Sequence, residues 1–296
     1  MTETLHRPRR SALYMPGANT RALEKAKTLA ADTLLLDLED AVAPEAKAEA
    51  RAAVCSAVET GGYGAREVII RINGLDTEWG LEDMAAAVAA RPDGILAPKV
   101  IDGGDIDRLN DAMSRAGAPD TMGLWVMIEM PKAILNIQEI AEAVGRTRLV
   151  GFVMGTNDLA KELRAHPSPD RAAFLFSLGA AVSAARAYGL VALDGVFNDI
   201  GNAEGLRAEC EHGRALGFDG KTLIHPSQLE LCNTVFSPDP EDVSQAAAVI
   251  AAFAAPENTG KGVIKVNGKM TELLHLEEAR RLVAIQKSID AFSAAL

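Results

Sequence analysis

The chain has 296 residues, of which 48% are hydrophobic and 24% are charged, and its formal net charge at pH 7 is −11. This length is sufficient for one large core, and the acidic charge excludes a partner bound through a phosphate backbone, so we expect no nucleic acid. No apolar run approaches the roughly 20 residues of a membrane-spanning helix, and the opening MTETLHRPRR lacks the apolar core of a secretory signal. The three cysteines form no CxxC pair, so we expect a cytoplasmic protein that binds no membrane.

Eight short runs of β-forming residues recur along the chain, and each is followed by an alanine-rich stretch with helical periodicity. Most runs are continuously apolar, which is typical of strands covered on both faces. Helices between them begin at prolines such as Pro44 and Pro131. The strands are expected at residues 12–15, 33–38, 68–72, 94–98, 124–129, 149–154, 191–195 and 221–224.

Eight such units predict an α/β fold of the (β/α)8 TIM-barrel type, a catalytic domain over residues 1–237. A doubly wound open sheet is the alternative, but no strand leads into the GxGxxG turn. Residues 238–296 predict a small C-terminal α/β appendage, with a helix over 241–254, a strand over 263–266 and a final helix from about residue 272. We expect this extension to cover the barrel mouth or to reach a neighbouring subunit.

Polar side chains follow most of the predicted strands, and in a parallel barrel the active groups lie at the carboxyl ends of strands. Charged residues are rarely buried unless they are paired or bound to a metal, so we expect these side chains to converge on one rim. They are Asp37, Glu39, Asp40, Arg71, Asn73, Lys99, Glu129, Asp158, Asp194, Asn198, Asp199 and His225.

Glu129 and Asp158 lie one β/α unit apart and therefore end adjacent strands. Two neighbouring carboxylates repel each other unless a cation lies between them, and Mg²⁺ commonly takes one or two protein carboxylates with water and substrate oxygens. A 2-oxo acid could chelate such an ion, which would polarise its carbonyl. The alternative is that each carboxylate caps the helix that follows it.

Arg71 ends the strand next to the predicted carboxylates, where its planar donor fork suits a carboxylate or a thioester oxygen that gathers charge. A structural ion pair with Glu39 or Asp40 is the alternative, and both roles can hold together. Lys99 could form a Schiff base, but a lysine among so many carboxylates is better interpreted as a charged partner.

The chain resembles the citrate lyase β-subunit and malyl-CoA lyase family, of the HpcH/HpaI aldolase–citrate lyase type. The resemblance covers nearly the whole barrel in the family's order. It is carried by the segments RRSALYMPGAN (9–19), LLLDLEDAV (34–42), VIIRINGL (68–75), MIEMPKAI (127–134), GTNDLAKEL (155–163), LDGVFNDI (193–200) and GKTLIHPSQ (220–228).

The resemblance implies that Glu129 and Asp158 bind Mg²⁺, for which Mn²⁺ can substitute, and that Arg71 binds substrate. Glu129, Arg10 and Lys99 are further expected substrate contacts, and the basic segment from Arg9 to Lys27 is a cradle for CoA phosphates. The expected catalytic residues are Arg71, Asp40 and Glu272.

The implied reaction is a reversible Claisen-type cleavage of a 3-hydroxyacyl-CoA, such as malyl-CoA, β-methylmalyl-CoA or citramalyl-CoA, into a 2-oxo acid and a CoA thioester. The implied assembly is a homotrimer or hexamer. One alternative is a (3S)-malyl-CoA thioesterase of the same family. A second is a non-catalytic or partner-dependent subunit, against which the intact Arg71, Glu129 and Asp158 argue.

The chain departs from the family pattern in its C-terminal segment. Many members have an aspartate there, followed two residues later by proline, that reaches a neighbouring subunit's site as acid or base. Here Glu272 takes the acid position and Leu274 takes the proline position. Glutamate is one methylene longer, and misplacement by about 1 Å can cost ~100-fold in rate. The metal site is therefore better supported than the lyase step.

Overall fold

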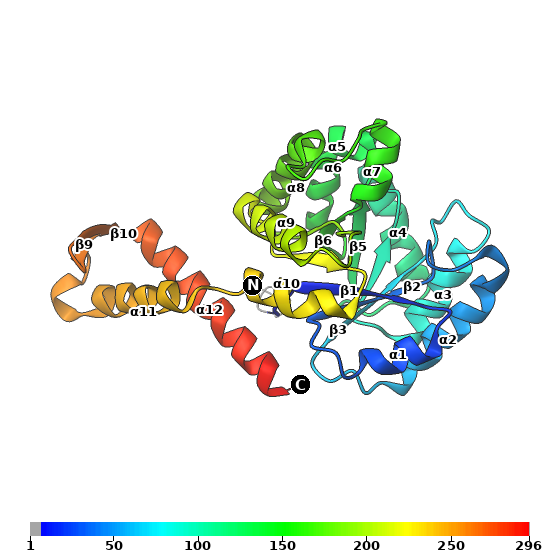
Figure 1. Cartoon of the computed structure of the whole chain (residues 1–296), viewed down its shortest axis with the longest axis horizontal. Helices are drawn as coiled ribbons and strands as arrows, with labels where there is room; N and C mark the ends of the chain where they lie inside the picture. The colour runs from blue at the N-terminus through cyan, green and yellow to red at the C-terminus, as the bar shows by residue number, and fades with distance from the viewer. Residues whose placement is uncertain (1–6, 296) are drawn as a thin grey trace. The chain divides into compact units, whose positions relative to one another are not determined.

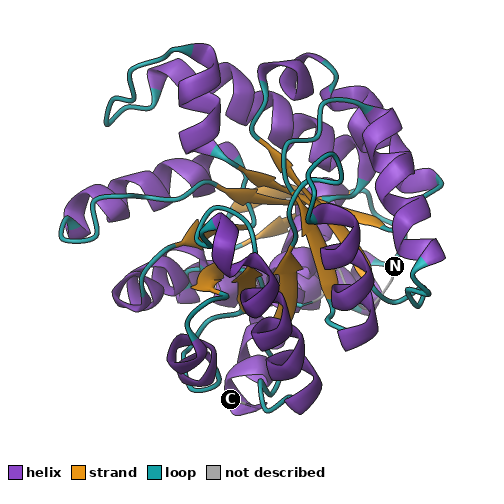
Figure 2. Ribbon diagram, turned by 90° about the vertical axis from the view of Figure 1, so that its right-hand side faces the viewer, coloured by secondary structure: helices purple, strands orange, loops and turns teal. Residues whose placement is uncertain are grey.

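The computed structural model describes residues 7–295, and eight of its strands close into one parallel barrel in chain order. Each strand lies within one residue of its predicted bounds, and the predicted (β/α)8 barrel is confirmed. Figure 2 shows the strands at the centre with helices around them. The strands are β1 (Ser11–Pro16), β2 (Thr33–Asp37), β3 (Glu67–Arg71), β4 (Gly94–Ala97), β5 (Gly123–Ile128), β6 (Leu149–Met154), β7 (Val191–Asp194) and β8 (Gly220–Leu223).

Helices connect successive strands of the barrel, as the colours and labels of Figure 1 show. Pro131 is the first residue of its helix, as predicted, and Pro44 opens a 3-10 turn, η2 (Pro44–Ala46), ahead of α2. The helices are α1 (Thr20–Ala26), α2 (Lys47–Thr60), α3 (Gly80–Ala90), α4 (Gly103–Arg115), α5 (Pro131–Leu135), α6 (Ile137–Glu142), α7 (Thr156–Leu163), α8 (Leu175–Tyr188), α9 (Ala203–Leu216) and α10 (Leu229–Phe236). No helix in the described part of the chain is long and apolar enough to cross a membrane.

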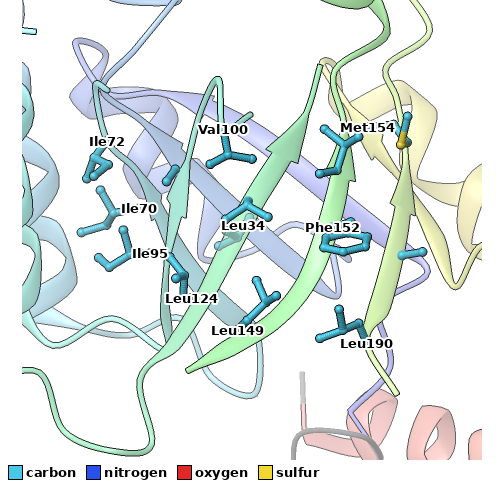
Figure 3. Close-up of a cluster of buried hydrophobic side chains, with 14 of the residues drawn as sticks. Leu34, Ile70, Ile72, Ile95, Val100, Leu124, Leu149, Phe152, Met154 and Leu190 are labelled. Carbon is cyan, nitrogen blue, oxygen red and sulfur yellow. The ribbon is translucent and has the colours of Figure 1, made fainter. Parts of the chain in front are cut away.

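The barrel has an outer and an inner apolar layer, which explains why its strands are apolar without alternation. The outer layer lies between strands and helices and includes Leu34, Ile70 and Phe152 (Figure 3). The inner layer includes Trp125, which is almost completely buried. A Cβ atom on Gly151 would lie 2.7 Å from the Trp125 ring, so this glycine leaves room for the indole.

The amino end of the barrel is closed by ion pairs. Arg9 donates to Glu67 through Nε and Nη2, each at 2.6 Å, and its guanidinium lies 5.1 Å from the centroid of the Trp125 ring. Arg10 donates to both carboxylate oxygens of Asp32, at 2.8 and 2.9 Å. Fully paired charges are the form in which buried ionic groups are tolerated.

The described residues after Phe236 form a second compact unit. It comprises α11 (Pro240–Ala254), β9 (Val263–Val266), β10 (Lys269–Glu272) and α12 (Leu273–Ala295). The predicted strand and both helices of this segment are confirmed, whereas β10 was not predicted because its polar sequence KMTE shows no apolar alternation. The unit has its own core, formed by Ala246, Val249, Ile264, Val266, Leu276 and Ala279.

Candidate active site

Arg71 is fixed by Asp37 at the carboxyl ends of β3 and β2. The two residues are paired in the barrel register, and Asp37 accepts hydrogen bonds from Nε and Nη2 of Arg71 at 2.6 Å each. Asp37 also accepts from the backbone N–H groups of Glu39 (2.9 Å) and Ala41 (3.1 Å). The Asp37 carboxylate therefore accepts four hydrogen bonds from within the chain. Of the three guanidinium nitrogens of Arg71, Nη1 is the one that does not donate to Asp37.

Nη1 of Arg71 faces two more carboxylates. It lies 2.8 Å from Oε2 of Glu39 and 3.4 Å from Oδ2 of Asp40, so both ion pairs considered from the sequence are present. Oε2 of Glu39 is buried and accepts no hydrogen bond, because the N–H groups of Nη1 do not point toward it despite the short distance. Asp40 is exposed at the rim beside Arg71. Its catalytic role stays a prediction.

Lys99 connects Glu39 with Glu129 through two different donors. Its backbone N–H donates to Oε1 of Glu129 and its amine donates to Oε1 of Glu39, both at 2.8 Å. Its φ of 55° lies in the left-handed region, which is uncommon for a residue other than glycine. Partial burial alone would lower the pKa of Lys99, but the bond to Glu39 raises it overall. The amine is thus a charged partner, as expected, rather than a free nucleophile.

Glu129 is a buried carboxyl group in an unfavourable electrostatic position. Burial raises its pKa to about 8, and Glu39 and Asp158 add to the rise against the opposing effects of the Lys99 N–H and Arg71. Its Oε2 accepts no hydrogen bond within the described residues and lies against Gly155, where a Cβ atom would come within 2.3 Å of it. A bound cation would offset the repulsion and use this free oxygen.

Asp158 lies in the first turn of α7, directly after β6, the neighbour of β5. Neither predicted ligand is the N-cap of its helix, although Asp158 lies in the first turn of α7, where the helix dipole favours a carboxylate. The N-caps of α7 and α5 are Gly155 and Met130, and neither helix has a side-chain cap. Across residues 7–295, no donor bonds to the Asp158 carboxylate. Glu129 and Asp158 therefore each keep carboxylate oxygens available to a ligand.

The donor set fits a hard cation such as Mg²⁺. In the described part of the chain, no three His, Cys, Asp or Glu side chains form a complete metal site. Mg²⁺ does not need one, because it usually binds through one or two carboxylates and keeps its other positions for water and substrate. A site built on Glu129 and Asp158 would leave room for such oxygens.

A buried polar network supports the loops that follow β2 and β3. The amine of Lys47 donates to the carbonyl oxygens of Leu38 (2.8 Å) and Glu39 (2.7 Å) and to Oδ1 of Asn73 (2.8 Å). Asn73 in turn donates to Asp83 at 2.6 Å. Sequence reasoning missed Lys47 and Asp83, because charged residues on amphipathic helices normally face solvent.

Two predicted residues lie away from this cluster. Asp194 ends β7 but faces the surrounding helices. There it binds Arg171 through both carboxylate oxygens and Lys221 at 3.2 Å, so the expectation that all strand-end charges converge is corrected. Arg10 precedes β1, at the amino end of the barrel, and is occupied by Asp32. The structure therefore does not place Arg10 beside Arg71. In the basic segment, Arg21 is exposed in the first turn of α1.

Glu272 belongs to the second unit, where it is the last residue of β10. Its backbone N–H donates to Nδ1 of His275 at 3.0 Å, and its side chain is exposed. Among the described residues, no hydrogen bond or ion pair holds the Glu272 carboxylate, and its catalytic role stays a prediction.

The barrel carries an immobilised arginine and two neighbouring carboxylates at the carboxyl ends of its strands, where enzymes of this fold have their active sites. The chain belongs to the HpcH/HpaI aldolase/citrate lyase family, whose sequence model matches residues 10–226. The resemblance read from the sequence motifs is thereby confirmed.

Relatives of the chain extend over almost its whole length. It is 50% identical over 287 residues to a (3S)-malyl-CoA thioesterase of Cereibacter sphaeroides, covering 97% of this chain and 98% of the relative. It is 36% identical to citrate lyase subunit beta of Escherichia coli, covering 94% and 93%. Among solved structures, CitE of Mycobacterium tuberculosis in complex with magnesium, acetoacetate and coenzyme A has a TM-score of 0.74 and 27% identity, covering 94% and 97%.

Proposed function

We propose that this protein is a Mg²⁺-dependent enzyme that hydrolyses a malyl-CoA-type thioester to malate and CoA. The observation that carries the proposal is the arrangement of Arg71, Glu129 and Asp158 at one rim of the barrel. Identity of 50% with a (3S)-malyl-CoA thioesterase over 97% of the chain supports the choice of substrate and reaction.

We assign the metal to Glu129 and Asp158, and expect Mn²⁺ to substitute for Mg²⁺. Magnesium in the CitE structures supports the identity of the ion. When bound, the ion supplies Lewis-acid polarisation of a substrate oxygen. The buried Glu129 carboxyl, with its raised pKa and free Oε2, is the group that would gain most from the ion.

The chain's own residues supply substrate binding and proton transfer. Asp37 holds Arg71 so that Nη1 can bind a negatively charged substrate oxygen, and Asp40 and Lys99 flank it. Glu272 takes the acid–base role that the family resemblance implies. It removes a proton from the water that attacks the thioester carbonyl carbon, the C–S bond breaks, and the CoA sulfur receives the proton.

Cleavage of a carbon–carbon bond is the second candidate, favoured by the 36% identity with citrate lyase subunit beta. The same residues would bind the substrate. Loss of the 3-hydroxyl proton would break the C–C bond, giving a 2-oxo acid and a thioester enolate that is then protonated on carbon.

We also propose a trimer or hexamer in which Glu272 acts in the barrel of a neighbouring subunit. The exposed carboxylate of Glu272 at the end of β10 supports this role. In this proposal the exposed Arg21 contacts the phosphates of CoA. Arg9 and Arg10 instead form ion pairs with Glu67 and Asp32 at the amino end of the barrel. The three cysteines are unpaired, which supports a cytoplasmic location.

The test is to incubate the purified protein with (3S)-malyl-CoA and Mg²⁺, with and without EDTA, and to identify the products. Malate and free CoA, lost with EDTA, would support hydrolysis. Glyoxylate and acetyl-CoA would support the lyase instead. Turnover that is insensitive to EDTA would contradict the metal assignment, and activity without any added protein would exclude the partner-dependent subunit.

A further inference from the structure

Tyr14 lies inside the barrel next to Arg71. It belongs to β1, and its ring packs against the inner apolar layer while keeping partial solvent exposure. The guanidinium carbon of Arg71 lies 4.8 Å from the centroid of the Tyr14 ring. Tyr14 is paired with Leu35, two residues before Asp37 on β2. The ring therefore forms a wall of the site on which Arg71 rests.

The hydroxyl group of Tyr14 has no strong acceptor among the described residues. Its one contact is with Sδ of Met127, at 3.9 Å. A thioether is a weak acceptor, and hydroxyl donors normally lie 2.7–2.8 Å from an oxygen acceptor. The same sulfur lies 3.6 Å from Nη1 of Arg71, the guanidinium nitrogen that does not donate to Asp37. Both donors thus approach the Met127 sulfur; Nη1 also has the carboxylates of Glu39 and Asp40 as neighbours, whereas the Tyr14 hydroxyl has only this weak acceptor in the described part of the chain.

The hydroxyl is suited to donate a hydrogen bond and unsuited to act as a base. Burial raises the pKa of Tyr14, Arg71 opposes the rise, and Asp37, Glu129 and Glu39 add to it. The phenol therefore stays protonated throughout the neutral range. A neutral donor beside a cationic donor is the arrangement that stabilises a partly charged oxygen of a ligand.

We propose that Tyr14 is a substrate-binding residue whose hydroxyl, together with Nη1 of Arg71, donates to an oxygen of the acid portion of the substrate. The inference rests on the proposed function, since it assigns a hydroxy-acid or oxo-acid group to the space beside Arg71. It adds a contact that makes the site selective for an oxygen at this position over an apolar group.

The test measures binding of (S)-malate to the full chain in the presence of Mg²⁺ by calorimetry, in the wild type and in Tyr14→Phe. Phenylalanine keeps the ring under Arg71 and removes only the donor. We expect malate to bind about 10- to 100-fold more weakly, the loss typical of a hydrogen bond to a charged group. Mg²⁺ affinity and the midpoint of thermal unfolding should stay unchanged. The matched control is Tyr188→Phe, which removes a surface hydroxyl that donates to Glu142 and should bind malate as the wild type does.

Malate affinity of Tyr14→Phe within about twofold of the wild type would overturn the inference. So would a loss of affinity accompanied by weaker Mg²⁺ binding or a fall in the unfolding midpoint, because the role would then be structural. A wild-type protein that binds malate but releases no CoA from malyl-CoA would contradict the thioesterase proposal alone, and the Tyr14 comparison would still be decided by binding. A wild-type protein that does not bind malate would overturn the Tyr14 inference, whereas the thioesterase proposal is decided by the products released from malyl-CoA.

Discussion

Asp37 and Arg71 occupy paired positions on neighbouring strands, and both oxygens of Asp37 are bonded to Arg71 at 2.6 Å. The pair fixes the plane of the guanidinium and directs Nη1 toward Glu39 and Asp40. A lysine ammonium is a point charge on a flexible stem, so Asp37 could not hold it in the fixed plane that it sets for the guanidinium.

Arg71→Lys should therefore lower kcat/KM by about 100-fold, because the charge is kept but its placement is lost. Steady-state kinetics with malyl-CoA would measure the effect. The control is Arg146→Lys, which changes an exposed ion pair with Asp107 and should leave kcat/KM unchanged. A fall of less than about threefold in Arg71→Lys would contradict the role given to the guanidinium.

Gly155→Ala should weaken Mg²⁺ binding by about 10- to 100-fold, the usual effect of disturbing a group next to a metal ligand. The added Cβ atom would lie 2.3 Å from Oε2 of Glu129, so the carboxylate must move, while the backbone φ of −100° suits alanine. Mn²⁺ titration followed by electron paramagnetic resonance measures the affinity. Gly179→Ala in α8 is the control, since its Cβ would meet nothing within 4 Å. Equal affinities in the two variants would argue against Glu129 as a ligand.

Asp158→Ala should abolish Mg²⁺-dependent turnover, and Glu272→Ala should abolish turnover with little loss of Mg²⁺ affinity. If Glu272 acts in a neighbouring barrel, co-expression of these two inactive chains should restore part of the activity. Mixed oligomers would then contain sites with both groups intact. Co-expression of Asp158→Ala with Glu129→Ala should restore none, since every barrel lacks a ligand. Wild-type activity in Asp158→Ala would show that the metal assignment is wrong.

The ion pairs of Asp194 should make the free energy of unfolding depend on pH in the acid range. Burial alone raises its pKa, but Lys221 and Arg171 outweigh burial and hold the pKa below its usual value. Its stabilising effect is thus complete above the unfolded pKa of about 3.9 and is lost as the pH falls through the lower folded pKa. Asp194→Asn, which removes the carboxylate partner of Arg171 and leaves Lys221 with Glu209 alone, should cost about 3–5 kcal/mol at pH 7. Denaturant unfolding from pH 7 to pH 3 should show this difference shrinking, and a constant difference would contradict the assignment.

The barrel could be predicted from the sequence because few folds other than a (β/α)8 barrel contain eight continuously apolar strands that alternate with helices. Glu129 and Asp158 could be placed together because one β/α unit separates them. The direction of strand-end side chains could not be predicted. Asp37 and Asp194 both end their strands, yet Asp37 binds Arg71 and Asp194 faces α9. A strand that is apolar on both faces gives no alternation from which to tell the two faces apart.

The buried hydrogen-bond network around Lys47 also could not be predicted from the sequence. Lys47 is almost completely buried, although its helix contains no feature that separates it from an exposed lysine. Its three acceptors come from Leu38, Glu39 and Asn73. Such partners come together only when the loops after β2 and β3 are folded.

The backbone conformation of Lys99 determines which substitutions this position of the rim can accept. Because its left-handed backbone directs one donor to Glu129 and its side chain directs another to Glu39, the two contacts can be separated by substitution. Glycine and asparagine accept this backbone shape, so they would keep the N–H on Glu129 and lose only the amine. Valine does not accept it and would disturb both carboxylates at once. In a library of variants at residue 99, tolerance should therefore follow backbone preference before side-chain charge.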